Sequence, residues 1–292
     1  MSATIQKLVV VGVGLIGASF SLALKSAGRV GRVVGVGRTR SNLEQALAMG
    51  AIDEVAEDAR LAADGADFVL VATPVGAMSD VFGRIATRLG AQAVVTDAGS
   101  TKQSVIATAR AVLGERIAQF VPGHPIAGSD ESGASAAKAS LYRDREVVLT
   151  PLPENSAEAV ARVRASWQAC GARVTEMCAT EHDAVLAAVS HLPHLLSYAL
   201  VHELAGRADA AQLFAHAGTG LRDVTRLAAS HPEMWRDICV ANREALLGEL
   251  RRYQDALAQL GAALEQTDGA ELERVFAAAR AARRAWTSRN GG

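Results

Sequence analysis

The chain has 292 residues, half of them hydrophobic, so it is long enough for two domains and a substantial buried core. Its 30 basic residues nearly balance its 31 acidic ones, and this charge gives no indication of nucleic acid or an anionic membrane surface as a partner. These features argue against a disordered chain and favour a small molecule as the partner.

The cysteines and the N-terminus indicate the compartment. Cys170, Cys178 and Cys239 are scattered, which fits neither a disulfide framework nor a paired-cysteine metal site. The N-terminus leads almost at once into a strand, without the features of a signal peptide, and no apolar run looks long enough to span a bilayer. We therefore expect a cytoplasmic protein with no metal, no membrane partner and no fused domain before Gly12.

The first motif is a glycine-rich turn between a strand and a helix. Residues 8–11 are typical of a strand buried on both faces, and residues 18–27 of a helix. The turn fits G-x-G-x-x-G, in which backbone N–H groups and a helix N-terminus hold a pyrophosphate. A second strand at 32–36 completes a βαβ unit. Five residues are therefore predicted to contact a dinucleotide: Gly12, Gly14, Leu15, Ile16 and Gly17.

The end of the second strand bears on which dinucleotide binds. An acidic side chain there would accept hydrogen bonds from the ribose 2′-hydroxyl of NAD. This chain has Arg38, Thr39 and Arg40 instead, and two arginines beside hydroxyl groups suit a phosphate dianion. We therefore favour NADP, with NAD as the alternative if the two arginines are only solvated charges.

Further strands are expected at 68–71, 93–96 and 119–121, with a helix over 76–89. This alternation predicts a doubly wound, mostly parallel sheet. Ligands bind such sheets beyond the carboxyl ends of the strands. Thr73, Pro74, Asp97 and Ser100 follow two of these strands, so we predict that they contact the cofactor. Ser100 also precedes a helical run and suits a helix N-cap.

His124 lies in the segment Gly123-His124-Pro125-Ile126-Ala127-Gly128, which we interpret as a glycine-rich loop. Glycine permits unusual backbone conformations and proline fixes φ, so such a loop can present an imidazole on a stiff frame. An isolated His-Pro pair is more often a simple turn. The function of His124 therefore depends on the motifs around it.

The second half of the chain changes to a helical pattern. Strands at 146–150 and 173–175 and a helix at 154–170 complete a first domain, 1–176, and residues 177–292 are predicted to be all-α. Pro193 should kink the first part of this region. His191 and His194 suit one helix face, but no third metal ligand follows at a suitable spacing. His182 and Asp183 are interpreted as structural or pocket-edge groups.

A long helix is expected from Pro232 to about Leu260. Its apolar residues recur at alternating spacings of four and three, a heptad-like pattern. Such a face packs inside a domain or forms a two-fold interface between subunits. The residues are Leu246, Leu250, Tyr253, Leu257 and Leu260.

Five motifs together, in chain order, resemble the prephenate/arogenate dehydrogenase family of tyrosine biosynthesis. The resemblance implies an α/β N-terminal Rossmann-type domain followed by an all-α C-terminal dimerisation domain, and a homodimer. The motifs are Gly12-x-Gly14-x-x-Gly17, Asp97-x-Gly99-Ser100-x-Lys102, Gly123-His124-Pro125-Ile126-Ala127-Gly128, Val189-Ser190-His191-Leu192-Pro193-His194, and Leu221-Arg222-Asp223-Val224-Thr225-Arg226 running to Met234-Trp235-Arg236-Asp237.

The resemblance also implies a reaction, the oxidative decarboxylation of prephenate, arogenate or both, with hydride transfer to NAD(P)+. His124 is implied as the acceptor of the substrate hydroxyl proton, with Ser100 hydrogen-bonded to the hydroxyl or to His124. Arg226 is implied to hold a substrate carboxylate, the alternative being a salt bridge with Asp223. His194 and Trp235 are implied in the substrate pocket.

Asp130 bears on the choice of substrate. Its carboxylate suits the ammonium group of arogenate, but it could equally face solvent or close the pocket. Two other functions remain open from the residues alone: another NADP-dependent Rossmann oxidoreductase, of the imine or ketone reductase type, and a non-catalytic NADP-sensing protein.

Overall fold

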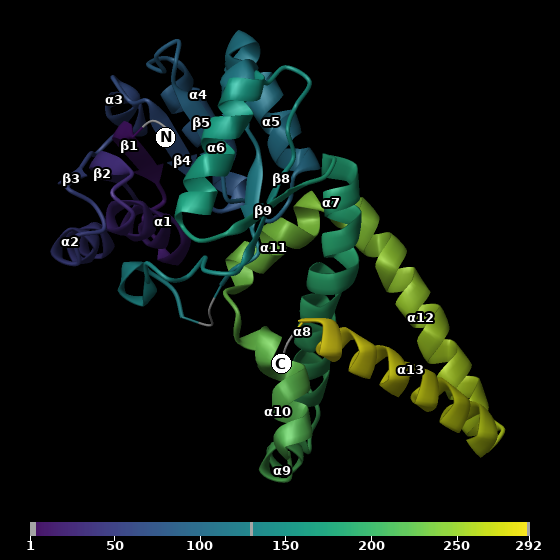
Figure 1. The fold of residues 1–292 in the computed structure, drawn as a ribbon. Coiled ribbons are helices and arrows are strands. Elements are labelled where there is room, and N and C mark those ends of the chain that lie inside the picture. The colour runs from purple at the N-terminus through teal and green to yellow at the C-terminus, as the bar shows by residue number, and fades with distance from the viewer. Residues whose placement is uncertain (1–3, 129–130, 291–292) are drawn as a thin grey trace. The chain divides into compact units, whose positions relative to one another are not determined.

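The computed structural model describes residues 4–128 and 131–290. It contains two compact units, one extending to Arg243 and the other beginning at Glu244. The first unit holds two sheets and most of the helices (Figure 1). The second consists of two long helices.

A six-stranded parallel sheet forms the centre of the first unit, in the order β3-β2-β1-β4-β5-β6. Helices cover both of its faces, which confirms the predicted doubly wound fold (Figure 1). The strands are β1 (Ile5–Val11), β2 (Val30–Val36), β3 (Glu54–Val55), β4 (Phe68–Val71), β5 (Val94–Asp97) and β6 (Phe120–Val121). The helices of this part are α1 (Leu15–Ser26), α2 (Arg40–Ala48), α3 (Ala59–Ala63), α4 (Met78–Ala86), α5 (Gln103–Leu113) and α6 (Ala157–Ala169), with short helices η1 (Val75–Ala77), η2 (Gly114–Gln119) and η3 (Ala134–Ala136).

Each central strand supplies both hydrophobic cores, because successive side chains of a strand point to opposite faces. In β1, Leu8 and Val10 pack in the core under α1, α2 and α6. Val9 and Val11 pack in the core under α3, α4 and α5. Burial on both faces explains the continuous apolar run in the sequence.

A second, three-stranded sheet carries the histidine motif. Its strands are β7 (Gly123–Pro125), β8 (Glu146–Leu149) and β9 (Arg173–Glu176), with β7 antiparallel and β9 parallel to β8. His124 therefore lies on a strand, opposite Val148, and the prediction of a loop at this position was wrong. The sequence misled because Gly-His-Pro has poor strand propensity, whereas pairing with the apolar β8 decides the conformation.

The glycine turn is held by close approaches of the backbone. Gly12 has φ +99°, and its N–H donates to the carbonyl of Val36 over 2.8 Å. A Cβ on Gly12 would lie 2.5 Å from the carbonyl oxygen of Ala72, and one on Gly17 would lie 2.3 Å from that of Gly12. Neither position can accept a side chain unless the backbone moves.

The helical part of the first unit follows β9. It comprises α7 (Ala179–Leu186), the π-helix η4 (Ala187–His191), α8 (Leu192–Ala205), α9 (Ala210–Ala215), α10 (Thr219–Thr225), η5 (Arg226–Ala229) and α11 (Pro232–Ala241). The irregularity expected near Pro193 takes the form of this π-helix, and the proline lies in the first turn of α8. Proline is tolerated there because the first turn needs no N–H donor.

The segment Ala179–Ala205 is long and apolar enough to cross a membrane by length and composition, contrary to our expectation. Three of its polar side chains, His182, Asp183 and His191, are buried within the first unit and make specific hydrogen bonds there. These bonds are those of a helix inside a folded domain.

The long helix expected from Pro232 to Leu260 is interrupted. It ends as α11 at Ala241, and after Asn242 the chain continues as α12 (Arg243–Glu265), which α13 (Gly269–Asn290) follows as a hairpin (Figure 1). The buried Asn242 side chain bonds to Asp183 and His191. The periodic apolar residues, Leu246 to Leu260, all lie in α12, so their pattern carries no information about the break before it.

The glycine turn gives a test of stability. We expect Gly12→Ala to lower the free energy of unfolding by about 1–3 kcal/mol or more, because the new Cβ meets backbone and φ is positive. Gly14→Ala is the matched control, because its Cβ meets nothing within 4 Å and we expect a change within about 0.5 kcal/mol. Urea unfolding measures both, and equal losses would contradict this account of the turn.

Candidate active site

The candidate site lies where the carboxyl ends of the central strands meet the helical part of the first unit. Strand β7 contributes His124, α7 contributes His182 and Asp183, and η4 contributes His191. Four ionisable side chains from three elements are thus buried in one region.

The backbone beside His124 is held by a buried ion pair. Asp97, at the end of β5, accepts hydrogen bonds from the N–H of Gly99 at 2.8 Å and of Gly123 at 3.0 Å. Lys102 donates to Asp97 over 2.5 Å and to the carbonyl of Gly123 over 2.6 Å. Both side chains are completely buried. The pair thereby fixes both polar groups of the residue that precedes His124.

This arrangement differs from the predicted role of Asp97 at the cofactor. Its carboxylate is enclosed and is occupied by Lys102 and two backbone N–H groups. Burial lowers the pKa of Lys102, while attraction to Asp97 opposes that shift. The Asp-x-Gly-Ser-x-Lys motif is therefore a structural clamp at its first and last positions.

A chain of hydrogen bonds extends from the His124 ring. Its Nδ1 lies 2.8 Å from Nε2 of His182, whose own Nδ1 lies 2.8 Å from Oδ1 of Asp183. The Asp183 carboxylate also accepts from the backbone N–H of Lys102 at 2.8 Å and of Gln103 at 2.9 Å, at the start of α5. His182 and Asp183 are therefore parts of the site, whereas the sequence analysis interpreted them as structural or pocket-edge groups and gave them no role at His124.

The surroundings keep His124 neutral. Burial holds its pKa well below 6.5, and repulsion from His182, Lys102 and His191 acts in the same direction. The opposite holds for Asp183: hydrogen bonds from His182 and two backbone N–H groups outweigh its burial and lower its pKa. A neutral histidine with a free ring nitrogen can accept a proton.

His191 is oriented by Asn242. The amide of Asn242 lies 3.1 Å from His191 Nδ1 and donates to the carbonyl of Asp183 over 2.8 Å. Burial lowers the pKa of His191 to about 4. The role of Asn242 had no signal in the sequence beyond its position in an apolar helical pattern.

His194 and Trp235, both predicted in the substrate pocket, lie together. Their rings stack with centroids 3.4 Å apart and an interplanar angle of 18°. His194 Nδ1 bonds to the carbonyl of Ser190 over 2.8 Å. Burial lowers the pKa of His194, and the charge of Arg226 acts in the same direction. Arg226 begins η5, which packs against α8, the helix that carries His194.

The other predicted residues lie as follows. Ser100 is half-buried and makes no side-chain hydrogen bond in the described ranges, so the predicted bond to His124 is not seen. The Thr73 hydroxyl is buried without a partner there, and Pro74 is exposed. Asp130 lies outside the described residues.

The arginines after β2 have different surroundings. Arg38 and Thr39 are exposed, whereas Arg40 begins α2 and pairs with Glu44 over 2.9 Å, one turn further on. The pairing of Arg40 favours a surface role for that residue. Arg38 is therefore the better candidate for a phosphate contact.

The glycine turn fits a dinucleotide. A Cβ on Gly14 would meet no atom within 4 Å, so this side of the turn is open. Helix α1 begins there without a side-chain cap or an acidic residue in its first turn. An uncapped helix N-terminus carries N–H donors and partial positive charge, and both suit a pyrophosphate.

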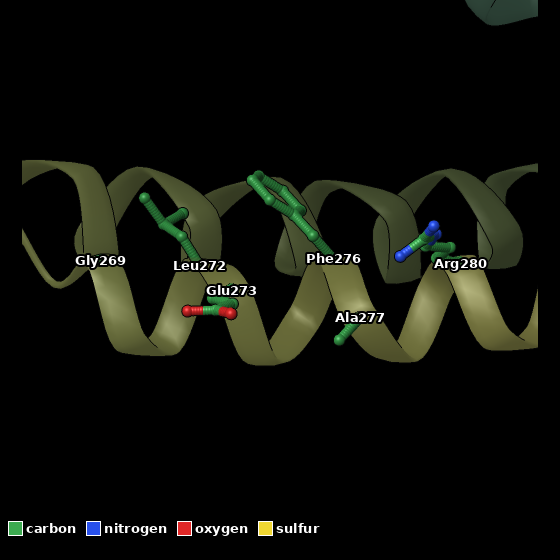
Figure 2. A pocket seen from close by; sticks show the side chains of 6 residues that line it. All are labelled: Gly269, Leu272, Glu273, Phe276, Ala277 and Arg280. Carbon is green, nitrogen blue, oxygen red and sulfur yellow. The ribbon is translucent and has the colours of Figure 1, made fainter.

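Two other features of the molecule bear on ligand binding. Within residues 4–128 and 131–290, no group of three histidine, cysteine or acidic side chains is placed to hold a metal ion. An open hollow of about 400 Å³ lies along α13, and Figure 2 shows its lining side chains on one helix. It contains none of the residues predicted for the active site.

The fold and the site together define the class, a dinucleotide-binding α/β protein with a buried, neutral histidine near the carboxyl ends of the central strands. A dehydrogenase requires such a base. The family model of the prephenate dehydrogenase nucleotide-binding domain matches residues 20–176, and that of the prephenate dehydrogenase dimerization domain matches residues 178–278. The chain belongs to the prephenate dehydrogenase family, as its motifs predicted.

Similar proteins span nearly the whole chain. A cyclohexadienyl dehydrogenase from Zymomonas mobilis is 35% identical over 280 residues, which cover 95% of each chain. A crystal structure of Aquifex aeolicus prephenate dehydrogenase with hydroxyphenyl propionate and NAD+ has a TM-score of 0.90 and 31% identity, covering 97% of this chain and 99% of that one. A Synechocystis arogenate dehydrogenase has a TM-score of 0.80 and 29% identity, covering 96% and 100%.

The buried ion pair can be tested by removing one partner. We expect Lys102→Met to lower the free energy of unfolding by about 3–5 kcal/mol, because it leaves the Asp97 charge buried without a countercharge. Arg84→Ala, which removes an exposed pair with Asp80, is the control and should change stability little. Urea unfolding measures both variants. A loss for Lys102→Met no larger than that of the control would show that the buried pair of Lys102 and Asp97 does not stabilise the fold.

Proposed function

We propose that this protein is an NAD(P)-dependent dehydrogenase that oxidatively decarboxylates prephenate, arogenate or both. Its products would be 4-hydroxyphenylpyruvate from prephenate and tyrosine from arogenate. The observation that carries the proposal is the buried, neutral His124 beside the carboxyl edge of a dinucleotide-binding sheet, in a chain of this family. A protein that only senses NADP has no need of such a base.

The bound nicotinamide supplies the chemistry of accepting a hydride from the ring carbon that bears the substrate hydroxyl. His124 accepts the proton of that hydroxyl, so the carbon–oxygen bond becomes a carbonyl. The electrons of the bond to the ring carboxylate then enter the ring, CO2 leaves, and the ring becomes aromatic. Because aromatisation drives this second step, the protein needs a base but no additional acid.

Several side chains are proposed to hold the substrate. Arg226 carries a planar cation suited to a carboxylate, and it begins η5, which packs against the helix that carries His194. The stacked rings of His194 and Trp235 would form one wall of the pocket. Ser100, between Asp97 and Lys102, would bond to the substrate hydroxyl, and Asp130 to the ammonium group of arogenate.

The cofactor is proposed to bind at the glycine turn, from Gly12 to Gly17, with Thr73 and Pro74 beside it. NADP is favoured over NAD, because the residues after β2 offer cations and no carboxylate. The open side of Gly14 supports the position of the pyrophosphate.

The helical C-terminal domain, residues 177–292, is proposed to form a homodimer. The family model that matches residues 178–278 is that of a dimerization domain. Large apolar side chains of the second unit support this assignment, because Leu257 is 49% exposed and Phe276 is 58% exposed within one chain. We propose the boundary between the two domains at residues 176 and 177, and a cytoplasmic location.

The most direct experiment is a set of four assays of the purified protein, with prephenate or arogenate and with NAD or NADP. Reduction of the dinucleotide at 340 nm should accompany release of one CO2 per turnover. Reduction without CO2 release would identify a different oxidoreductase. No turnover in any of the four would refute the proposed function.

Replacing the proposed base gives the first mutational test. We expect His124→Asn to lower kcat by about 10²–10⁴-fold, because asparagine cannot accept the hydroxyl proton. The control is His202→Asn, an exposed histidine on α8, which should leave kcat unchanged. Near-normal turnover of His124→Asn would refute the assignment.

The pH profile of the wild-type protein checks the same assignment. A base with a lowered pKa is neutral above that pKa, so kcat/KM should stay level as the pH falls to 6.5. It should decline only at lower pH, as His124 becomes protonated. A decline centred above pH 6.5 would contradict the buried, neutral state of His124.

Arg38 gives the test of cofactor choice. We expect Arg38→Ala to weaken NADP binding about tenfold or more, through loss of a charge-assisted hydrogen bond to phosphate, and to affect NAD little. Arg40→Ala is the matched control, since Arg40 is paired with Glu44 and its loss should matter less. Dinucleotide titrations followed by protein fluorescence measure both. Equal weakening of NADP and NAD would contradict the preference for NADP.

A further inference from the structure

We propose that His182 and Asp183 are positioning residues that fix His124 in one tautomer, with Nδ1 protonated and the Nε2 lone pair free to accept the substrate proton. This inference rests on the proposed function, because a tautomer matters for turnover only if His124 is the base. It assigns a role to two residues that the motifs of the sequence do not explain.

The Asp183 carboxylate is the fixed end of this chain of hydrogen bonds. It receives the N–H groups of Lys102 and Gln103 at the N-terminus of α5, where the helix dipole also favours a negative charge. Its lowered pKa follows from these bonds and from that with His182. An ionised carboxylate can only accept hydrogen bonds.

The tautomer of each histidine follows in turn. Because Asp183 only accepts, His182 Nδ1 must carry the proton in their 2.8 Å hydrogen bond. In the neutral form of His182 with its proton on Nδ1, the lone pair is on Nε2, and His124 then donates from Nδ1 across the next 2.8 Å contact. The lone pair of neutral His124 is therefore on Nε2.

The free nitrogen is the one available to a substrate. Within residues 4–128 and 131–290, His124 Nε2 has no hydrogen-bond partner, and the residue keeps 8% of its surface exposed. The other ring nitrogen, Nδ1, is hydrogen-bonded to His182. If the tautomer were reversed, Nε2–H would face the substrate hydroxyl and could not take its proton.

The hydrogen bonds from Asp183 through His182 to His124 form a relay. The charges around His124 explain why this relay must fix the tautomer without charging the ring. The groups that face it are His182 and Asp183 from α7, Lys102 before α5, His191 from η4 and, through Lys102, Asp97 from β5. Burial and three cationic or ionisable neighbours disfavour the imidazolium. When His124 takes the substrate proton, its Nδ1–H still donates to Nε2 of His182, whose own N–H is held by the Asp183 carboxylate.

Histidine NMR tests the tautomer directly and does not depend on turnover. With 15N-labelled histidine near pH 8, we expect His124 to show a protonated Nδ1 and an unprotonated Nε2, and the same for His182. The His124→Asn and His182→Gln variants assign the signals by loss of a resonance. A His124 ring protonated on Nε2 would overturn the proposal.

Kinetics of the relay variants test its consequence. We expect Asp183→Asn to lower kcat by about 10²–10⁴-fold with KM changed only a few-fold, because the asparagine amide can donate and so reverse both tautomers. His182→Leu should give a similar loss. His182→Gln should recover at least tenfold over leucine, since its amide oxygen can accept from His124 Nδ1.

Gln103→Ala is the matched control. Its side chain touches the same carboxylate at 3.4 Å but lies outside the proton chain, and its backbone N–H remains. This variant should keep kcat and the His124 tautomer. Thermal unfolding and dinucleotide titration of every variant separate a lost relay from a lost fold.

The outcomes also separate this proposal from the proposed function. If the wild-type protein turns over neither prephenate nor arogenate, the function is refuted while the NMR result still decides the tautomer. If turnover is normal and Asp183→Asn matches Gln103→Ala in kcat, the relay is refuted and the function stands. Equal losses for His182→Gln and His182→Leu would also refute it.

Discussion

The carboxylate of Asp183 at the N-terminus of α5 is the interaction on which the rest of the site depends. It bonds a helix of the helical region to two backbone N–H groups of the nucleotide-binding region. The same residue orients His182 and, through its carbonyl, Asn242. One buried charge therefore links the position of the two regions to the orientation of His124, so that correct packing and a correctly oriented base form together.

A second buried charge holds the same histidine from its other side. Asp97 and Lys102 bind the N–H and the carbonyl of Gly123, while β8 pairs with the backbone at His124. The ring is held by α7 and the backbone by the loop after β5. Removing water from such charges is costly unless they are hydrogen-bonded, and Asp97 and Lys102 bond to each other and to the backbone of Gly123. The consequence is a base with little freedom to move away from the cofactor edge.

The sequence was sufficient for the central sheet because Leu8 to Val11 and Phe68 to Val71 are short apolar runs bounded by turn residues, a pattern typical of a parallel strand covered on both faces. It also identified His124, through motifs that are contiguous in the chain. It placed His182 and Asp183 only as structural or pocket-edge groups and gave Asn242 no role, because their roles come from contacts with residues 51 to 81 positions away. It did not predict the internal hydrogen bonds of Asp97, whose place after a strand suits a ligand contact as well as a structural role.

The position of His124 on a strand, rather than in the expected loop, changes the chemistry available to it. In an exposed loop its pKa would stay near 6.5 and its two tautomers would interconvert, so only part of the protein would be ready to accept a proton. On β7, burial keeps the ring neutral and the hydrogen bond to His182 selects one nitrogen. Burial alone would leave the tautomer undetermined, and the hydrogen bond to His182 alone would not remove the ring from water. Only their combination gives a neutral base whose lone pair faces the substrate.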